Sequence, residues 1–188
     1  MSLFAIADLH LSLGEDKPMD IFAGWSNYVE RLEDNWRKLI TDDDTVVIGG
    51  DISWAMKLEE TFVDFSFIDK LPGKKLFLKG NHDYWWGTKS KIDSFLSKNG
   101  FDSISIIFNN SYVCDDYAVC GTRGWFLENG TEQDIKVLNR EVGRLIMSIE
   151  SALKTGKEPV VFLHYPPYYN GIECKEIMDV LLKYNVKK

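Results

Sequence analysis

Short apolar runs alternate with amphipathic segments over the first hundred residues of the chain. Three runs have the aliphatic character of buried strands, at residues 3–7, 45–48 and 76–78. Between them, apolar residues recur at helical spacing from Val29 to Ile40 and from Leu58 to Leu71, and a third helix is expected over 89–99. Such strand–helix alternation predicts a parallel sheet with right-handed crossovers, in which the first run forms a central strand.

The pattern changes after residue 103. Three short β runs, separated by turns, predict an antiparallel meander that forms a second sheet, at residues 104–108, 112–114 and 117–120. A long amphipathic helix then follows from Ile135 to Leu153, and it begins with a capping-box sequence at 131–134. A further strand at 159–163 and a helix over 173–183 complete the pattern. We expect one α/β domain over residues 1–188.

Composition and charge narrow the possible functions. With 45% hydrophobic and 27% charged residues, the chain has the composition of a globular protein. Its net charge of -7 argues against a surface for long nucleic acids, although bound metal ions could still attract a small phosphorylated substrate. The 3 cysteines form no CxxC pair. Without a signal-like start or a membrane-spanning apolar run, we expect a cytoplasmic protein with no membrane partner.

Polar residues suited to metal binding follow the ends of the apolar runs. Asp8 and His10 follow the first run, Asp51 follows the second after two glycines, and Asn81 follows the third after Gly80. Because parallel strands bring their carboxyl ends to one edge of a sheet, we expect these side chains to converge there. Carboxylates, imidazoles and an amide oxygen suit a pair of divalent ions that share Asp51 as a bridge.

All 3 histidines of the chain, His10, His82 and His164, come just after apolar runs. His82 could bind a metal or transfer a proton near neutral pH, and Asp83 could orient its imidazole. Taken alone, Asn-His-Asp is also an ordinary turn sequence. The placement of every histidine after a predicted strand favours a functional site.

Three further residues could contact a substrate. Trp54 and Trp85 lie close to the polar motifs and could form an apolar wall, or they could simply pack the loops. Arg123 stands between two glycines, where it could bind a phosphate as a fork or lie on a surface loop. The sequence leaves these alternatives open.

The motifs resemble signature blocks of the calcineurin-like metallophosphoesterase superfamily. Four of the family's five blocks occur in family order across the chain: Asp8-Leu9-His10, Gly49-Gly50-Asp51, Gly80-Asn81-His82-Asp83 and His164. The resemblance implies a four-layer α/β/β/α sandwich of mixed sheets. It also implies two divalent ions, for which the mixed nitrogen and oxygen ligands admit manganese, iron, zinc or cobalt.

The resemblance also implies a role for each matching residue. Asp8, His10 and Asp51 would hold the first ion, and Asp51, Asn81 and His164 the second. His82 would contact the phosphate and protonate the leaving oxygen, oriented by Asp83. The implied reaction is hydrolysis of a phosphomonoester or phosphodiester by a metal-bridging hydroxide, on a small phosphorylated substrate or a phosphoprotein.

One family block, Gly-His-x-His, is missing from the chain. The last residues, Val186-Lys187-Lys188, have the pattern of a strand that is just beginning, so we expect a C-terminally truncated sequence. Loss of the ligands in that block should weaken metal binding. The alternative that the sequence leaves open is a non-catalytic protein-interaction module on the same fold.

Overall fold

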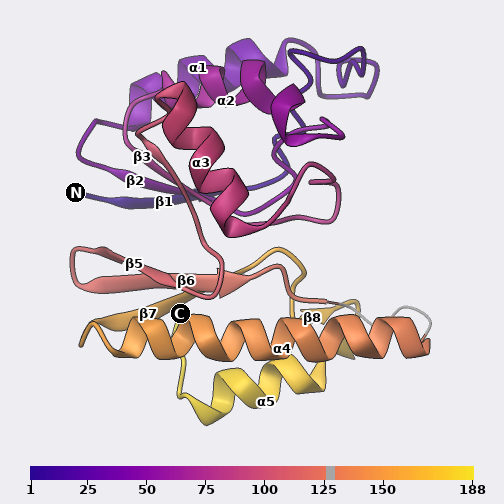
Figure 1. The fold of residues 1–188 in the computed structure, drawn as a ribbon, viewed down its shortest axis with the longest axis vertical. Coiled ribbons are helices and arrows are strands. Elements are labelled where there is room, and N and C mark those ends of the chain that lie inside the picture. Colours follow the sequence, from indigo (N-terminus) through magenta and orange to yellow (C-terminus); the bar gives the residue numbers. More distant parts are fainter. Residues whose placement is uncertain (126–129) are drawn as a thin grey trace. The chain divides into compact units, whose positions relative to one another are not determined.

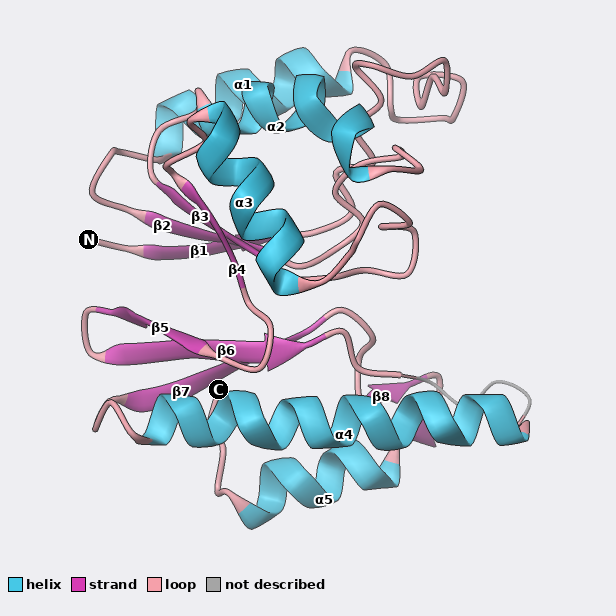
Figure 2. Cartoon of the chain, viewed as in Figure 1, coloured by secondary structure: helices cyan, strands magenta, loops and turns pink. Residues whose placement is uncertain are grey.

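The computed structural model describes residues 1–125 and 130–188, and the chain divides into two compact units, Met1–Ile106 and Ile107–Lys188. Each unit combines a β-sheet with helices, which confirms the predicted mixed α/β class (Figures 1 and 2). That one domain covers residues 1–188 stays a prediction. None of the helices in the described residues is long and apolar enough to cross a membrane.

The first unit contains a four-stranded, fully parallel sheet with the order β1-β2-β3-β4. Its strands are β1 (Leu3–Ile6), β2 (Thr45–Ile48), β3 (Lys74–Phe77) and β4 (Ile104–Ile106). The crossovers carry α1 (Tyr28–Leu39), the 3₁₀ helix η1 (Leu58–Thr61) with α2 (Phe62–Asp69), and α3 (Lys89–Asn99). In Figure 1, α1, α2 and α3 lie on one face of this sheet.

The register of this sheet places all its strand ends at the same level. The last residues of the four strands pair in sequence across the sheet: Ile6, Ile48, Phe77 and Ile106. The loops that follow β1, β2 and β3 therefore leave from one edge. That edge is where the sequence places the polar motifs.

Two of the strand predictions are wrong in detail. β1 is an edge strand rather than a central one, since the sheet order begins with it. β4 does not open the second sheet, because it pairs in parallel with β3. Ile104 and Ile106 are buried in the core of the first unit, so the burial of these two side chains on the helix-covered side accounts for the pairing.

Aromatic rings fill the centre of the first unit's core. Phe65 on α2 is fully buried and meets Phe77 and Trp85 edge to face, with ring centroids 5.3 Å and 5.0 Å away. Edge-to-face contacts of this kind add to the free energy of area burial. Trp36 on α1 is buried as predicted, whereas Leu39 at the last position of the same helix is 66% exposed.

The second unit contains a three-stranded mixed sheet with the order β5-β6-β7. Its strands are β5 (Ser111–Cys114), β6 (Tyr117–Thr122) and β7 (Glu158–Leu163). β5 and β6 form the predicted antiparallel pair, and β7 joins β6 in parallel. A short hairpin follows, formed by β8 (Tyr168–Tyr169) and β9 (Ile172–Glu173).

Two helices complete the second unit. The long helix α4 (Glu132–Leu153) packs on the sheet, and α5 (Lys175–Lys183) packs on α4. The predicted capping box is confirmed, because Thr131 accepts from the Asp134 amide while the Asp134 carboxylate accepts from the Thr131 amide. Beside β7, the Val161 amide donates to the carbonyl of Lys188 at 2.9 Å.

Candidate functional site

The loops after β1 and β2 run side by side and carry three of the predicted metal ligands. The amide of Asp8 donates to the Gly50 carbonyl at 3.0 Å, and the amide of His10 donates to the Asp51 carbonyl at 2.9 Å. An isolated bridge between Leu11 and Ser53 continues the parallel pairing. The hydrogen-bonding pattern of the sheet thus extends past its strand ends and fixes Asp8, His10 and Asp51 relative to one another.

All three of these residues adopt a left-handed backbone conformation. Their φ angles are 58° at Asp8, 46° at His10 and 53° at Asp51. Among the described non-glycine residues with positive φ, the remaining ones are all asparagine or aspartate: Asn27, Asn109, Asp115, Asn170 and Asn185. Aspartate and histidine adopt this conformation more often than most non-glycine residues do, but it still costs conformational energy, and such strain is concentrated at functional sites.

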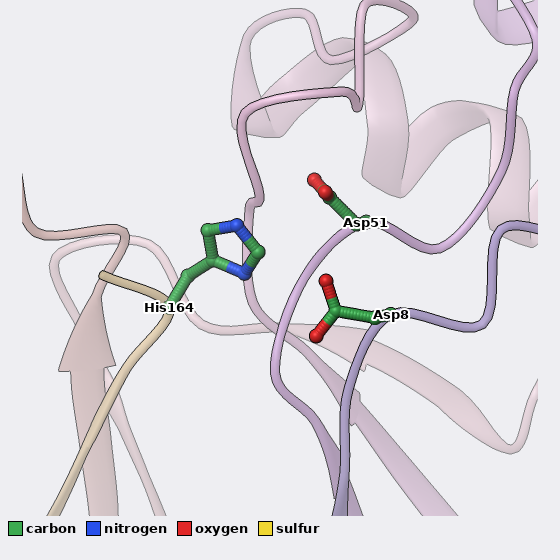
Figure 3. Close-up of side chains that lie close together, drawn as sticks. All are labelled: Asp8, Asp51 and His164. Carbon is green, nitrogen blue, oxygen red and sulfur yellow. The ribbon is translucent and has the colours of Figure 1, made fainter. Parts of the chain in front are cut away.

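The side chains of these residues converge on a small volume. His10 Nε2 lies 3.8 Å from Asp8 Oδ1 and 3.7 Å from Asp51 Oδ2. Asp8 and Asp51 also bring carboxylate oxygens within 4.8 Å of each other (Figure 3). With metal–ligand bonds of about 2.1 Å, the ligand atoms of one ion stand roughly 3 Å apart, so small side-chain adjustments suffice to bind one. The donor set therefore fits a divalent cation.

The two carboxylates differ in their environment. The Asp51 side chain is only 3% exposed, whereas that of Asp8 is 55% exposed. The His82 amide donates to Asp51 Oδ1 at 2.8 Å, which partly compensates the buried charge. A bound cation would compensate the remaining charge, and it could reach the site from the Asp8 side.

The His82 imidazole lies among aromatic rings. It is tilted against Trp54 with ring centroids 4.9 Å apart, and its edge meets His10 at 5.7 Å. The phenolic oxygen of Tyr84 lies 3.2 Å from His82 Nδ1. Asn81, between Gly80 and His82 in the same loop, is half-buried.

The carboxylate of Asp83 makes hydrogen bonds to two loops of the site. Its carboxylate accepts hydrogen bonds from the amides of Asp51, Ile52 and Gly80 at 2.7–2.9 Å. It also accepts from the Trp85 indole at 3.1 Å, and none of its hydrogen bonds reaches His82. Burial raises the pKa of Asp83 to about 6, while the backbone amides oppose this shift. Asp83 therefore clamps the loops after β2 and β3 together, and its role in orienting the His82 imidazole stays a prediction.

Gly80 is required by this close approach of the two loops. A Cβ built at Gly80 would overlap both the carboxylate and the amide nitrogen of Asp51. The backbone of Asp51 can come this near only because residue 80 has no side chain. The glycine before Asn81 is thus explained by packing against the predicted bridging ligand.

The two tryptophans behave differently. Trp54 is half-buried and stacks on His10, with ring centroids 4.8 Å apart and an interplanar angle of 21°. It stays a predicted substrate contact because it borders both His10 and His82. Trp85 is 3% exposed, packs on Phe65 and donates to Asp83, so its placement favours the packing alternative.

Arg123 and His164 belong to the second unit. The guanidinium of Arg123 lies 3.4 Å from Glu141 Oε1 and 4.6 Å from the ring centre of Trp125. Burial lowers the pKa of Arg123, while Glu141 opposes this shift. Arg123 is therefore mostly buried and paired with Glu141, and its role in binding a phosphate stays a prediction. His164 directly follows β7, as predicted. The next residue, Tyr165, donates its amide to the Arg123 carbonyl at 2.8 Å.

Two residues near the site escaped the sequence analysis. Asp64 on α2 is 1% exposed and accepts hydrogen bonds from the Leu13 amide and the Ser53 hydroxyl, so it ties α2 to the loops after β1 and β2. Burial raises the pKa of Asp64. A carboxylate next to the buried Phe65 in an apolar helix was the available signal. For Tyr84, the position directly after Asp83 was the one sequence feature that could have indicated a place in the site.

Comparison with known proteins gives one match over the whole length. The sequence model of the family described as calcineurin-like phosphoesterase matches residues 1–187. No curated protein is significantly similar to the chain.

Two of the solved structures that are similar to the chain illustrate its relation to known folds. The protein of unknown function AQ665 from Aquifex aeolicus has a TM-score of 0.50 and 18% identity, and the match covers 95% of this chain and 87% of that one. Phosphopantetheinyl hydrolase (PptH) from Mycobacterium tuberculosis has a TM-score of 0.49 and 13% identity, with 97% and 78% covered. At 18% identity, the similarity to the Aquifex protein indicates a shared fold alone.

The clamp role of Asp83 predicts the effect of Asp83→Asn. The carboxamide NH₂ group of asparagine would face backbone N–H groups that now donate to the Asp83 carboxylate, and two donors cannot form a hydrogen bond. We therefore expect the free energy of unfolding to fall by about 2 kcal/mol. Urea denaturation at pH 8, where the carboxylate is ionised, measures this, with exposed Asp34→Asn on α1 as the control. Unchanged stability with lost activity would instead support a role in orienting His82.

The close approach at Gly80 predicts that Gly80→Ala is destabilising. We expect a loss of about 2 kcal/mol or more, because the added methyl group overlaps Asp51. Gly143→Ala on α4 is the matched control, since a Cβ there has no neighbour within 4 Å and alanine favours a helix. Equal stability of the two variants in urea denaturation would contradict the predicted packing.

Proposed function

This chain belongs to the calcineurin-like phosphoesterase family, and on that basis we propose that it is a metal-dependent phosphohydrolase that cleaves a phosphomonoester or a phosphodiester. The observation that carries the proposal is the convergence of Asp8, His10 and Asp51. These residues come from neighbouring strand ends, adopt strained backbone conformations and direct donor atoms to one volume. Turns that serve only to connect strands do not require both strained backbone conformations and converging donor atoms.

In this proposal Asp8, His10 and Asp51 would hold one divalent ion, and Asp51, Asn81 and His164 would hold a second. The assignment of His164 is supported by family order and by its position directly after a strand. Manganese, iron, zinc and cobalt all suit these nitrogen and oxygen donors. When bound, such ions polarise a phosphoryl group and lower the pKa of a water molecule.

The residues of the chain would contribute in distinct ways. His82 contacts the phosphate and transfers a proton from Nε2 to the leaving oxygen as the bond between that oxygen and phosphorus breaks. Asp83 keeps the Asp51 loop and the His82 loop in register. Trp54, beside both His10 and His82, offers an apolar surface to the organic part of an ester.

The overall charge and the cysteines support a particular class of substrate and location. A net charge of -7 disfavours long nucleic acids, so we propose a small phosphorylated molecule or a phosphoprotein as the substrate. Cys114, Cys120 and Cys174 are all buried free thiols, which are typical of a reducing compartment. This supports a cytoplasmic location.

The test is hydrolysis by metal-stripped protein to which Mn²⁺ is returned. The full-length natural protein is assayed with a chromogenic phosphomonoester and a chromogenic phosphodiester, and the ratio of the two rates narrows the substrate class. We expect Mn²⁺-dependent turnover that falls at least about 100-fold in both Asp51→Asn and His82→Ala.

The control is Asp34→Asn, which makes the same chemical change as Asp51→Asn at an exposed position on α1. This variant should retain full turnover. If the wild-type protein with bound metal hydrolyses neither ester, the proposal is wrong, and a non-catalytic interaction module on this fold becomes the better account.

A further inference from the structure

The Nδ1 atom of His82 has a hydrogen-bonding partner that its sequence neighbour Asp83 does not supply. Tyr84 Oη lies 3.2 Å from this nitrogen, and the two rings are nearly perpendicular at 86°. The ring of Trp54 approaches His82 within 4.9 Å between centroids. The imidazole is thus held at Nδ1 by a hydroxyl, and its ring packs against an indole.

The local backbone explains how Tyr84 reaches His82. The Tyr84 amide donates to the His82 carbonyl at 2.8 Å, which closes a tight turn across Asp83 and returns the chain toward the imidazole. Tyr84 is 52% exposed, whereas the next residue, Trp85, is 3% exposed. Core packing therefore accounts for Trp85 and does not account for Tyr84. The contact with His82 is the specific interaction that the Tyr84 hydroxyl makes.

We propose that Tyr84 is the positioning residue of His82, and that it makes the enzyme effective on esters with poor leaving groups. This inference rests on the proposed function. A protonated imidazole carries N–H groups on both nitrogens, and a tyrosine oxygen can accept one of them. In the step that releases the leaving group, the Nε2–H bond breaks and the proton forms a bond with the leaving oxygen. The ring becomes neutral, keeps its hydrogen on Nδ1 and continues to donate to Tyr84 Oη.

The kinetic consequence depends on the leaving group. An oxygen that leaves as a poor anion needs the proton, so hydrolysis of such an ester depends on the orientation of His82. An activated oxygen such as p-nitrophenolate leaves without full protonation. Loss of the Tyr84 hydroxyl should therefore slow the two classes of ester unequally.

The experiment compares phenyl phosphate with p-nitrophenyl phosphate in Tyr84→Phe, or the corresponding diesters if the enzyme prefers them. We expect kcat to fall about tenfold for the phenyl ester and less than about threefold for the nitrophenyl ester, with KM unchanged for both. In a His82→Ala background, Tyr84→Phe should have no further effect, because the hydroxyl acts through His82. Tyr168→Phe is the matched control at an exposed tyrosine of β8, where activity should stay the same.

A second readout does not require activity. In metal-free protein labelled with ¹⁵N-histidine, only 3 ring systems appear, and His82 is assigned by its loss in His82→Ala. At a pH where the ring is neutral, the hydrogen should reside on Nδ1 in the wild type. Tyr84→Phe should move the tautomer population toward Nε2–H.

The outcomes separate this inference from the proposed function. An unchanged tautomer population, or an equal loss of kcat for both esters, would overturn the role of Tyr84 while leaving the hydrolase assignment in place. A rise in KM alone would also overturn it, since it would place Tyr84 against the substrate instead. A wild-type protein that hydrolyses no ester would refute the function, and the tautomer measurement would still report on the hydrogen bond.

Discussion

The carboxylate of Asp83 is the interaction on which the candidate site depends. It accepts from backbone amides in two loops, including those of Asp51, Ile52 and Gly80. A carboxylate that is 1% exposed is costly, and these amides, together with the Trp85 indole, make its burial possible. The result is that the loops after β2 and β3 are held in one arrangement. This clamp therefore fixes the positions of Asp51 and His82 relative to each other.

The clamp is connected to the core and to the first loop. Trp85 donates to Asp83 from one side and packs on Phe65 on the other, which links the site to the aromatic core under α2. From the same helix, Asp64 reaches the loops after β1 and β2 through Leu13 and Ser53. Buried carboxylates thus play a structural role in the site, in addition to the proposed role of Asp8 and Asp51 in binding ions. Preorganisation of this kind allows strained ligand conformations to persist.

The features that could be predicted from the sequence are those whose signal lies within a short stretch of the chain. Aliphatic runs identified β1, β2 and β3, helical spacing predicted α3, and the strand-end position of each histidine indicated the site. The partner of β4 could not be predicted, because alternating isoleucines reveal a strand and not the strand with which it pairs. The clamp made by Asp83 could not be predicted for a similar reason, since its partners Asp51 and Ile52 lie more than 30 residues away in the chain. The left-handed backbone at His10 could not be predicted, because histidine adopts this conformation in only a small share of its occurrences.

The central proposal is that two bound ions would share Asp51, and Mn²⁺ binding measured by electron paramagnetic resonance tests it without any substrate. Metal-stripped wild-type protein, Asp51→Asn and the exposed control Asp34→Asn are titrated with Mn²⁺, and the free ion is quantified at each step. A shared ligand predicts that Asp51→Asn weakens the binding of every ion by about tenfold or more, while Asp34→Asn binds as the wild type does. Binding by Asp51→Asn with the affinity and stoichiometry of the wild type would contradict the account.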